Sequence, residues 1–159
     1  MYIRPATPAD AQVILDFIQA LAEYEREPDA VQTDAATIGR QLAEDPAPFE
    51  CLLAFEGADP VGFALYFYNY STWRGLQGVH LEDLFVPPSQ RGKGYGKALF
   101  EAVAKVAVDA GFVRMEWAVL DWNTPAIDFY LALGAEALDG WTTFRLADEA
   151  LVKVGGSQG

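Results

Sequence analysis

The chain has 159 residues, 23 of them acidic and 11 basic, so its formal net charge is −12 at pH 7. This excess of negative charge argues against nucleic acid or an anionic membrane as a partner, because their phosphates would repel it. No stretch approaches the roughly 18 apolar residues of a membrane span, and the N-terminus lacks an apolar signal core. We therefore expect a cytoplasmic protein. The acidic balance is compatible with a cationic substrate, and equally with a surface that only aids solubility.

A chain of this length can bury most of its apolar surface in one core. We expect a single domain over residues 1–154 and a flexible tail at 155–159. One cysteine, Cys51, excludes a disulfide framework, and its place in the alternating run 49–55 predicts a buried small hydrophobe rather than a reactive thiol. We expect no metal site.

The first half of the chain predicts a strand, two helices and a hairpin. A short strand at 2–4 is followed by Thr7-Pro8-Ala9-Asp10, which is typical of a helix start. Apolar residues from Ile14 to Leu21 then recur at helical spacing, and a weaker helix is expected over 34–44. Alternating strands at 49–55 and 61–70, joined by a turn, indicate a hairpin.

In the second half, a strand at 79–86 leads through a glycine-rich loop into a helix that Gly111 ends. Lys97, Glu101, Lys105 and Asp109 follow one another at intervals of four on the polar face of this helix. A strand at 115–120, a short helix from Asn123 to Gly134 and a last strand at 141–146 complete the pattern. The order predicts an α/β fold with a mixed, mostly antiparallel sheet flanked by helices, in which 79–86 and 115–120 are parallel neighbours.

The loop at residues 91–97 reads Arg-Gly-Lys-Gly-Tyr-Gly-Lys and separates the strand from the helix. Glycines allow a positive φ and a close approach of backbone N–H groups to an anion, and the helix start adds unpaired donors. The dinucleotide fingerprint fails because its third glycine would fall on Lys97. The nucleotide P-loop fails because Arg91 and Ala98 occupy two of its fixed positions. The pattern [QR]-x-x-G-x-[GA] fits at Arg91, Gly94 and Gly96.

A second motif is more specific than the loop. It runs from Leu120 to Tyr130 as Leu-Asp-Trp-Asn-Thr-Pro-Ala-Ile-Asp-Phe-Tyr, and it accompanies Tyr70-Ser-Thr-Trp73 and Leu81-Glu-Asp-Leu-Phe-Val86. Together with the loop, these segments resemble the diamine (spermidine/spermine) N-acetyltransferase branch of the GNAT superfamily, which also includes thialysine acetyltransferases. The resemblance extends over nearly the full chain and implies the GNAT fold.

The resemblance implies acetyl-CoA as the acetyl donor and direct transfer to an amine within a ternary complex. The strand backbone would pair with the pantetheine arm and polarise the thioester carbonyl, the loop would hold the pyrophosphate, and Tyr130 would protonate the departing thiolate. By chemistry alone, Asn123 could equally be a helix cap, and Tyr130 a packing aromatic. The implied cofactor-binding residues are Leu84, Phe85, Val86, Arg91, Gly92, Lys93, Gly94, Tyr95, Gly96, Lys97, Asn123, Thr124, Pro125, Ala126 and Tyr130.

An alkylammonium group has a pKa of about 10.4, so an amine acceptor must lose a proton before it attacks. The resemblance gives this role to Glu82, acting through water. His80 alternates onto the same strand face and stands where the family more often has an aromatic residue. We interpret it as a strand-surface residue, with proton transfer as the alternative.

The implied substrate-binding residues are Tyr24, Glu25, Glu82, Glu116, Trp117, Ala118 and Asp139, whose carboxylates would hold a second ammonium group of a small cationic amine. Glu25 could instead be a solvated helix-end acid, and Trp117 could belong to the core. The loop before Gly140-Trp141 is shorter than in the polyamine enzymes. The resemblance also implies a homodimer, and the aromatic segment 66–73 is a candidate for its interface.

Two other functions fit the residues. One is a GNAT enzyme that acetylates a protein N-terminus or lysine, which would need an open groove. The other is a non-catalytic sensor that binds acetyl-CoA without turnover. The presence of Tyr130 and Glu82 argues against the sensor.

Overall fold

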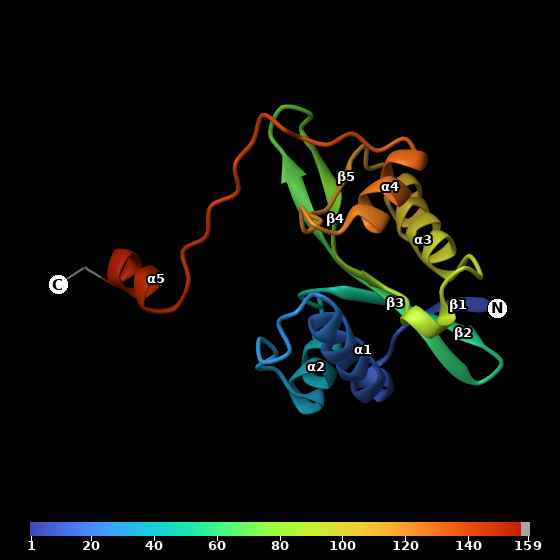
Figure 1. Cartoon of the computed structure of the whole chain (residues 1–159). Coiled ribbons are helices and arrows are strands. Elements are labelled where there is room, and N and C mark those ends of the chain that lie inside the picture. Colours follow the sequence, from blue (N-terminus) through green and yellow to red (C-terminus); the bar gives the residue numbers. More distant parts are fainter. Residues whose placement is uncertain (157–159) are drawn as a thin grey trace. The chain divides into compact units, whose positions relative to one another are not determined.

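A five-stranded sheet organises the first 120 residues of the computed structural model, which describes residues 1–156 (Figure 1). The strands follow one another in the order β1-β2-β3-β4-β5, and every neighbouring pair is antiparallel except β4 and β5. The expected mixed sheet and its parallel pair are therefore confirmed. The strands are β1 (Tyr2–Pro5), β2 (Glu50–Glu56), β3 (Asp59–Ser71), β4 (Leu76–Phe85) and β5 (Met115–Glu116).

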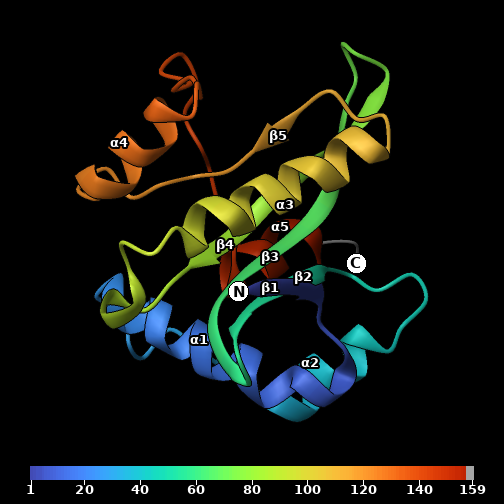
Figure 2. The ribbon, with the colours of Figure 1, turned by 90° about the vertical axis from the view of Figure 1, so that its right-hand side faces the viewer.

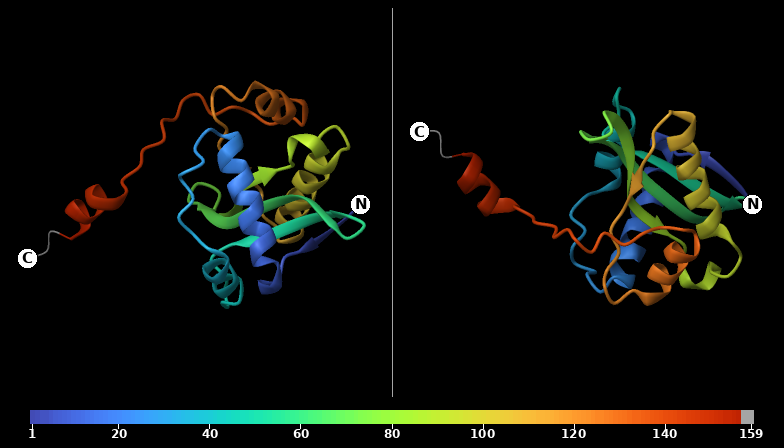
Figure 3. Two further views of the ribbon diagram at one scale, coloured as in Figure 1. Left: turned by 60° about the horizontal axis from the view of Figure 1, so that its bottom comes forward. Right: turned by 90° about the horizontal axis from the view of Figure 1, so that it is seen from above.

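Helices cover both faces of this sheet and bury a separate apolar core on each. Helix α3 (Tyr95–Asp109) packs on one face, where Leu99 and Val103 are fully buried. Helices α1 (Ala11–Tyr24) and α2 (Ala35–Leu42) cover the other face, where Ile14 is fully buried. Figure 2 shows α3 on the opposite side of the strands from α1 and α2, and Figure 3 (left) shows α1 running across the sheet.

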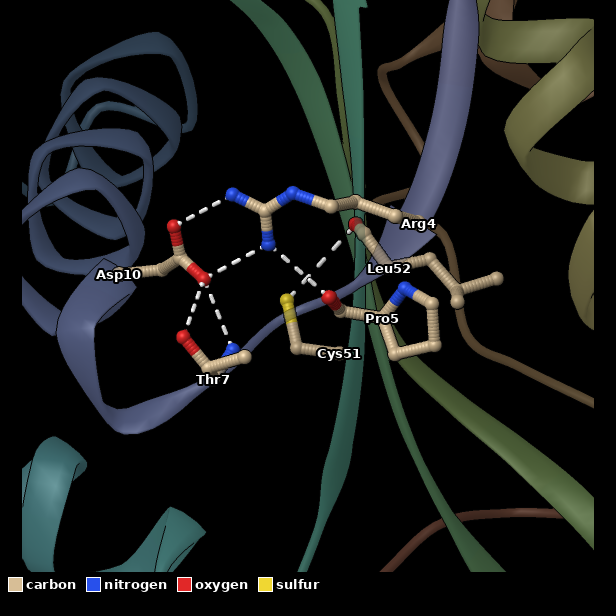
Figure 4. Close-up of polar contacts among 6 residues, drawn as sticks. All are labelled: Arg4, Pro5, Thr7, Asp10, Cys51 and Leu52. Atoms are coloured by element: carbon tan, nitrogen blue, oxygen red, sulfur yellow. Dashed lines mark hydrogen bonds and ion pairs between the residues drawn. The ribbon is translucent and has the colours of Figure 1, made fainter.

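The first strand is tied to the first helix by a bidentate ion pair (Figure 4). Both terminal nitrogens of Arg4 donate to the carboxylate of Asp10 at 2.8 Å. The N–H and hydroxyl of Thr7 donate to the same carboxylate. These hydrogen bonds cap the start of the helix, where the sequence predicted it. These hydrogen bonds, above all those from Arg4, hold the pKa of Asp10 well below its usual range.

Cys51 lies on β2, and only 3% of the residue is exposed. Burial, more than the nearby acids, raises the pKa of its thiol to about 12. Because the thiolate is the nucleophile, such a thiol is inert at neutral pH. The reading of Cys51 as a buried small hydrophobe is confirmed.

The fifth strand is much shorter than predicted. It was expected over 115–120, but pairing with β4 stops after His80 and Glu116. Directly beyond that point the pairing of β3 with β4 shifts register, so that Glu82 is an extra residue on β4. A bulge of this kind bends its strand and ends pairing, which explains the early end of β5.

The chain from Asp121 onward forms a second unit. Its first helix, α4 (Thr124–Ala132), agrees with the sequence prediction. The strand predicted at 141–146 is wrong: these residues have no regular structure, because alternation makes a strand only where another strand pairs with it. A helix that the sequence analysis missed follows, α5 (Asp148–Gly155), so Gly155 of the expected tail is helical, and residues 157–159 lie outside the described residues.

Candidate active site

The bulge in β4 places two acidic side chains on one face of the sheet. Asp83 is the register partner of Leu65, which packs on the core beneath α1 and α2. A carboxylate oxygen of Glu82, the extra residue, lies 3.5 Å from Nε2 of His80. The side chains of Glu82 and His80 therefore point to this same face. The prediction that His80 and Glu82 share a strand face is confirmed, although Glu82 itself lies in the bulge.

Asp83 is the functional candidate that sequence reasoning missed. Burial, and after it the negative charges of Glu82 and Glu25, raises its pKa to about 7. Glu25 follows the last residue of α1, and burial raises its pKa too, so it is not simply a solvated helix-end acid. Glu82 and Glu25 are thus both near enough to Asp83 for their charges to act on it. The Glu82-Asp83 pair was visible in the sequence, but only the bulge turns both residues to one side.

His80 of β4 lies between two neighbouring strands, β3 and β5. Its ring lies against Phe67 of β3, with centroids 4.9 Å apart and planes 30° apart. Its register partner across the parallel pair is Glu116 of β5, so their side chains share a face. Arg114 forms an ion pair of 2.7 Å with Glu116 on that face.

Of the predicted substrate residues on and after β5, Trp117 lies on the other face. It packs edge-on against Phe100 of α3, with ring centroids 5.1 Å apart, and belongs to the surroundings of the α3 core. The core alternative for Trp117 is therefore confirmed by its packing. Glu116 therefore shares a sheet face with His80, and Trp117 does not. Ala118 is exposed.

The glycine loop has the backbone conformation that an anion cradle requires. Gly92 has a φ of 80° and Gly94 a φ of 84°, both in the left-handed region, and Gly94 caps the N-terminus of α3. A Cβ added at either position would meet no protein atom within 4 Å. The surroundings of these two glycines are therefore open, and the backbone amides at the start of α3 lie beside them. A bound phosphate needs both.

The three basic residues of the loop differ in their contacts. The Nε of Arg91 donates to the carbonyl of Val86 at 3.0 Å, which ties the loop back to the end of β4. Lys93 donates to the side chain of Gln90 at 2.9 Å. Lys97 lies 3.6 Å from Glu101 one turn further along α3. The side chains of the two lysines are thus held by weak surface contacts that a stronger anion can replace.

The edge of β4 beyond His80 is open on the side of β5. Leu84 and Phe85 pair with β3 on their other side, and their pairing with β5 has already ended. Val86 follows the strand directly, and its side chain is buried. Backbone groups of Leu84 and Phe85 on this side have no strand partner among the described residues and can pair with an extended ligand, whereas the carbonyl of Val86 already accepts a hydrogen bond from Arg91.

The predicted residues of the second unit lie on or beside α4. The side-chain oxygen of Asn123 accepts a hydrogen bond of 3.4 Å from the N–H of Ala126, so it caps this helix. Tyr130 packs edge-on against Phe129 with ring centroids 5.1 Å apart, and burial raises the pKa of its phenol to about 12. Asp139 is exposed.

Within residues 1–156, no group of three or more His, Cys, Asp or Glu side chains is placed to hold a metal ion. None of the helices described there is long and apolar enough to cross a membrane.

Comparison with known proteins agrees with this geometry. The model of the acetyltransferase (GNAT) family matches residues 14–135. Thialysine N-epsilon-acetyltransferase of Bos taurus is 38% identical over 97% of this chain and 96% of its own. Spermidine/spermine N(1)-acetyltransferase-like protein 1 of Homo sapiens is 32% identical over 94% of this chain and 23% of its own.

Solved structures show the same fold. An integron cassette protein from the mobile metagenome of V. cholerae superposes with a TM-score of 0.82 at 22% identity, covering 98% of both chains. An aminoglycoside acetyltransferase from an uncultured soil metagenomic sample reaches 0.78 at 17% identity, over 93% of this chain and 96% of its own. The chain belongs to the GNAT acetyltransferase family and is an acyltransferase, and enzymes of this family use acetyl-CoA.

Proposed function

We propose that this enzyme transfers the acetyl group of acetyl-CoA to a primary amine of a small cationic acceptor: a diamine, a polyamine or a lysine analogue such as thialysine. The observation that carries the proposal is the concentration of negative charge at the β4 bulge, where Glu82 and Glu25 act on Asp83 next to the unpaired edge of β4. Carboxylates in such a cluster attract ammonium groups. Full-length likeness to thialysine N-epsilon-acetyltransferases supports the same class of acceptor.

On the donor side, acetyl-CoA would supply an activated acetyl thioester and a pyrophosphate for the loop to hold. The amides after Gly92 and Gly94, at the start of α3, would receive the phosphates. The backbone at 84–86 would bind the extended arm and polarise the thioester carbonyl. The resemblance also assigns cofactor contacts to Asn123, Thr124, Pro125 and Ala126, at the start of α4.

On the acceptor side, the ammonium group must lose its proton before attack. An ordinary glutamate has a pKa of about 4.3, some six units below the amine, so it is a weak base for this step. Asp83, with a pKa of about 7, halves this difference. We assign ammonium binding to Glu82 and Glu25, and acceptance of the proton, directly or through water, to Asp83 together with Glu82.

The leaving thiolate requires a proton, and Tyr130 is the proposed donor. Its pKa of about 12 keeps the phenol protonated throughout the neutral range, so that a donor hydrogen is always present. We propose direct attack in a ternary complex, because the acidic residues are assigned to ammonium binding and proton acceptance and Tyr130 to proton donation. The one thiol of the chain, Cys51, is buried and has a raised pKa.

Release of thiol from acetyl-CoA tests the proposal. The enzyme at saturating acetyl-CoA should release CoA with diamines, polyamines and thialysine, and Tyr130→Phe should lower kcat by about 10²-fold. Phe129→Tyr is a matched control on the neighbouring residue and should retain most of kcat. Thiol release with a lysine peptide alone would support the protein acetyltransferase, and tight acetyl-CoA binding without any release would support the sensor.

We also propose that the enzyme is a homodimer and that the extended segment after α4 contributes to the interface. Phe144 is 90% exposed and Trp141 74% exposed, which is costly for aromatic side chains in water. Of the aromatic segment 66–73, Trp73 is also 90% exposed, whereas Tyr66 is buried. Light scattering should give the mass of two chains for the native protein and for Val108→Glu, an exposed control on α3, and of one chain for Phe144→Glu. A native monomer would contradict the proposal.

A further inference from the structure

The only histidine of the chain lies among the groups proposed to bind the acceptor. Its Nε2 is 3.5 Å from the carboxylate of Glu82, and its side chain is 29% exposed. Contact with Phe67 on one side and pairing opposite Glu116 on the other fix the strand position of the ring. None of the roles assigned so far uses His80.

The two glutamates near His80 differ in their basic partners. Glu116, across the parallel pair, already shares its charge with Arg114 at 2.7 Å. Glu82, on the same strand as His80, has the imidazole as its nearby cationic partner when that ring is protonated. Phe67, from β3, carries no charge. Asp83 follows Glu82, and Glu25 reaches this corner from α1.

A protonated ring and a cationic substrate would therefore compete for the same carboxylate. With the ring neutral, Glu82 keeps its full negative charge for an ammonium group. With the ring protonated, each of the two glutamates on this face has a basic partner: Arg114 for Glu116 and His80 for Glu82. Histidine is the side chain that ordinarily changes charge between about pH 5 and 8.

We propose that His80 is a positioning residue that, when protonated, pairs with the carboxylate of Glu82 and thereby makes binding of the cationic acceptor dependent on pH and selective for neutral to alkaline conditions. The inference rests on the proposed function and adds a determinant of acceptor affinity. It acts on binding of the acceptor, not on acetyl-CoA, because the glycine loop lies beyond the end of β4.

Imidazole proton NMR tests the inference without turnover. One histidine gives one set of imidazole signals, so the titration needs no assignment. Glu82→Gln removes the carboxylate that lies 3.5 Å from the ring and should lower the titration midpoint. Glu101→Gln, which removes one negative charge from α3 on the opposite face, should move it by less than about 0.1. Saturating spermidine or thialysine should also lower the midpoint in the native enzyme, because binding and protonation are reciprocal.

Kinetics provides the second readout. As the pH falls from 8 to 5.5, KM for the amine should rise in the native enzyme about 3- to 5-fold more than in His80→Phe, which keeps an aromatic ring beside Phe67. KM for acetyl-CoA should show no such difference. His80→Arg, a permanent cation, should raise KM for the amine at every pH.

The outcomes separate this inference from the proposed function. If no amine is acetylated by the native enzyme, the proposed function is wrong. If amines are acetylated but the midpoint is the same in Glu82→Gln and with bound amine, or if His80→Phe keeps the native pH dependence of KM, the role of His80 is wrong and the proposed function stands.

Discussion

Arg91 lies over the ring of Tyr24, with its guanidinium carbon 4.4 Å from the ring centroid. The same guanidinium group is 5.9 Å from the ring of Phe85 and donates to the carbonyl of Val86. Arg91 therefore joins three segments: the end of α1, the end of β4 and the glycine loop. Tyr24 and Arg91 were predicted separately for the acceptor and the donor, and the structure brings them into contact.

Removing the aromatic face of Tyr24 should loosen the glycine loop. A cation–π contact is worth about 0.5–2 kcal/mol, so Tyr24→Leu should weaken acetyl-CoA binding about 2- to 30-fold in calorimetry. Tyr24→Phe keeps the ring and is the matched control, with a loss of less than about 2-fold. Equal affinities for the Leu and Phe variants would show that the contact does not support the donor site.

The left-handed conformation of Gly94 gives a second prediction. A β-branched side chain is strained there, and it would also point its Cβ into the space beside the loop amides. Gly94→Val should therefore lower acetyl-CoA affinity at least about 30-fold. Gly57→Val is the control, because Gly57 has a φ of 60° and equally open surroundings in the β2–β3 turn. Both variants should lose similar stability in urea, and retained affinity in Gly94→Val would remove the phosphate assignment.

Replacing Asp83 by Asn should make the protein more stable and the enzyme less active. Its pKa of about 7 lies above the ordinary value for aspartate, so the folded state disfavours its charged form. Asp83→Asn should therefore raise the free energy of unfolding by on the order of 1–3 kcal/mol at pH 8, and the gain should shrink as the pH falls from 7 towards 4. The same change should lower kcat about 10- to 100-fold. Loss of stability at pH 8 would contradict the description of Asp83 as a strained acid.

The Arg4–Asp10 pair predicts the reverse dependence on pH. The pKa of Asp10 is lowered in the folded state, so its contribution is complete above about pH 4 and is lost progressively as the pH falls below that value. Asp10→Asn should cost about 1–3 kcal/mol at pH 7 in urea unfolding. Asp16→Asn, which removes the charge of an exposed carboxylate that accepts a hydrogen bond from Gln12, should cost less than about 0.5 kcal/mol. A cost for Asp10→Asn that is the same at pH 7 and pH 2 would contradict the ion pair.

Features set by local sequence were predictable. The positive φ at Gly92 and Gly94 and the cap at Asn123 each depend on a few adjacent residues, and all were expected. The helix starts and the β2–β3 hairpin follow for the same reason, since spacing and turn residues decide them.

Features set by pairing between strands were not predictable. The bulge at Glu82 depends on the register between β3 and β4, so Asp83 escaped notice although it lies next to a predicted catalytic residue. The short β5 and the missing strand at 141–146 have the same origin, because alternation shows where a strand can form but not whether a partner is present. The contact of Arg91 with Tyr24 likewise requires the folded sheet.

The most direct test of the central claim is product analysis by mass spectrometry after incubation with acetyl-CoA and a mixture of acceptors. The mixture should contain thialysine, spermidine, a short diamine, an uncharged aromatic amine, and peptides with a free N-terminus or lysine. We expect mono-acetylated products of the small cationic amines, at a kcat/KM at least about 10²-fold above that of the peptides and the uncharged amine. Acetylation of the peptides with the small cationic amines untouched would contradict it.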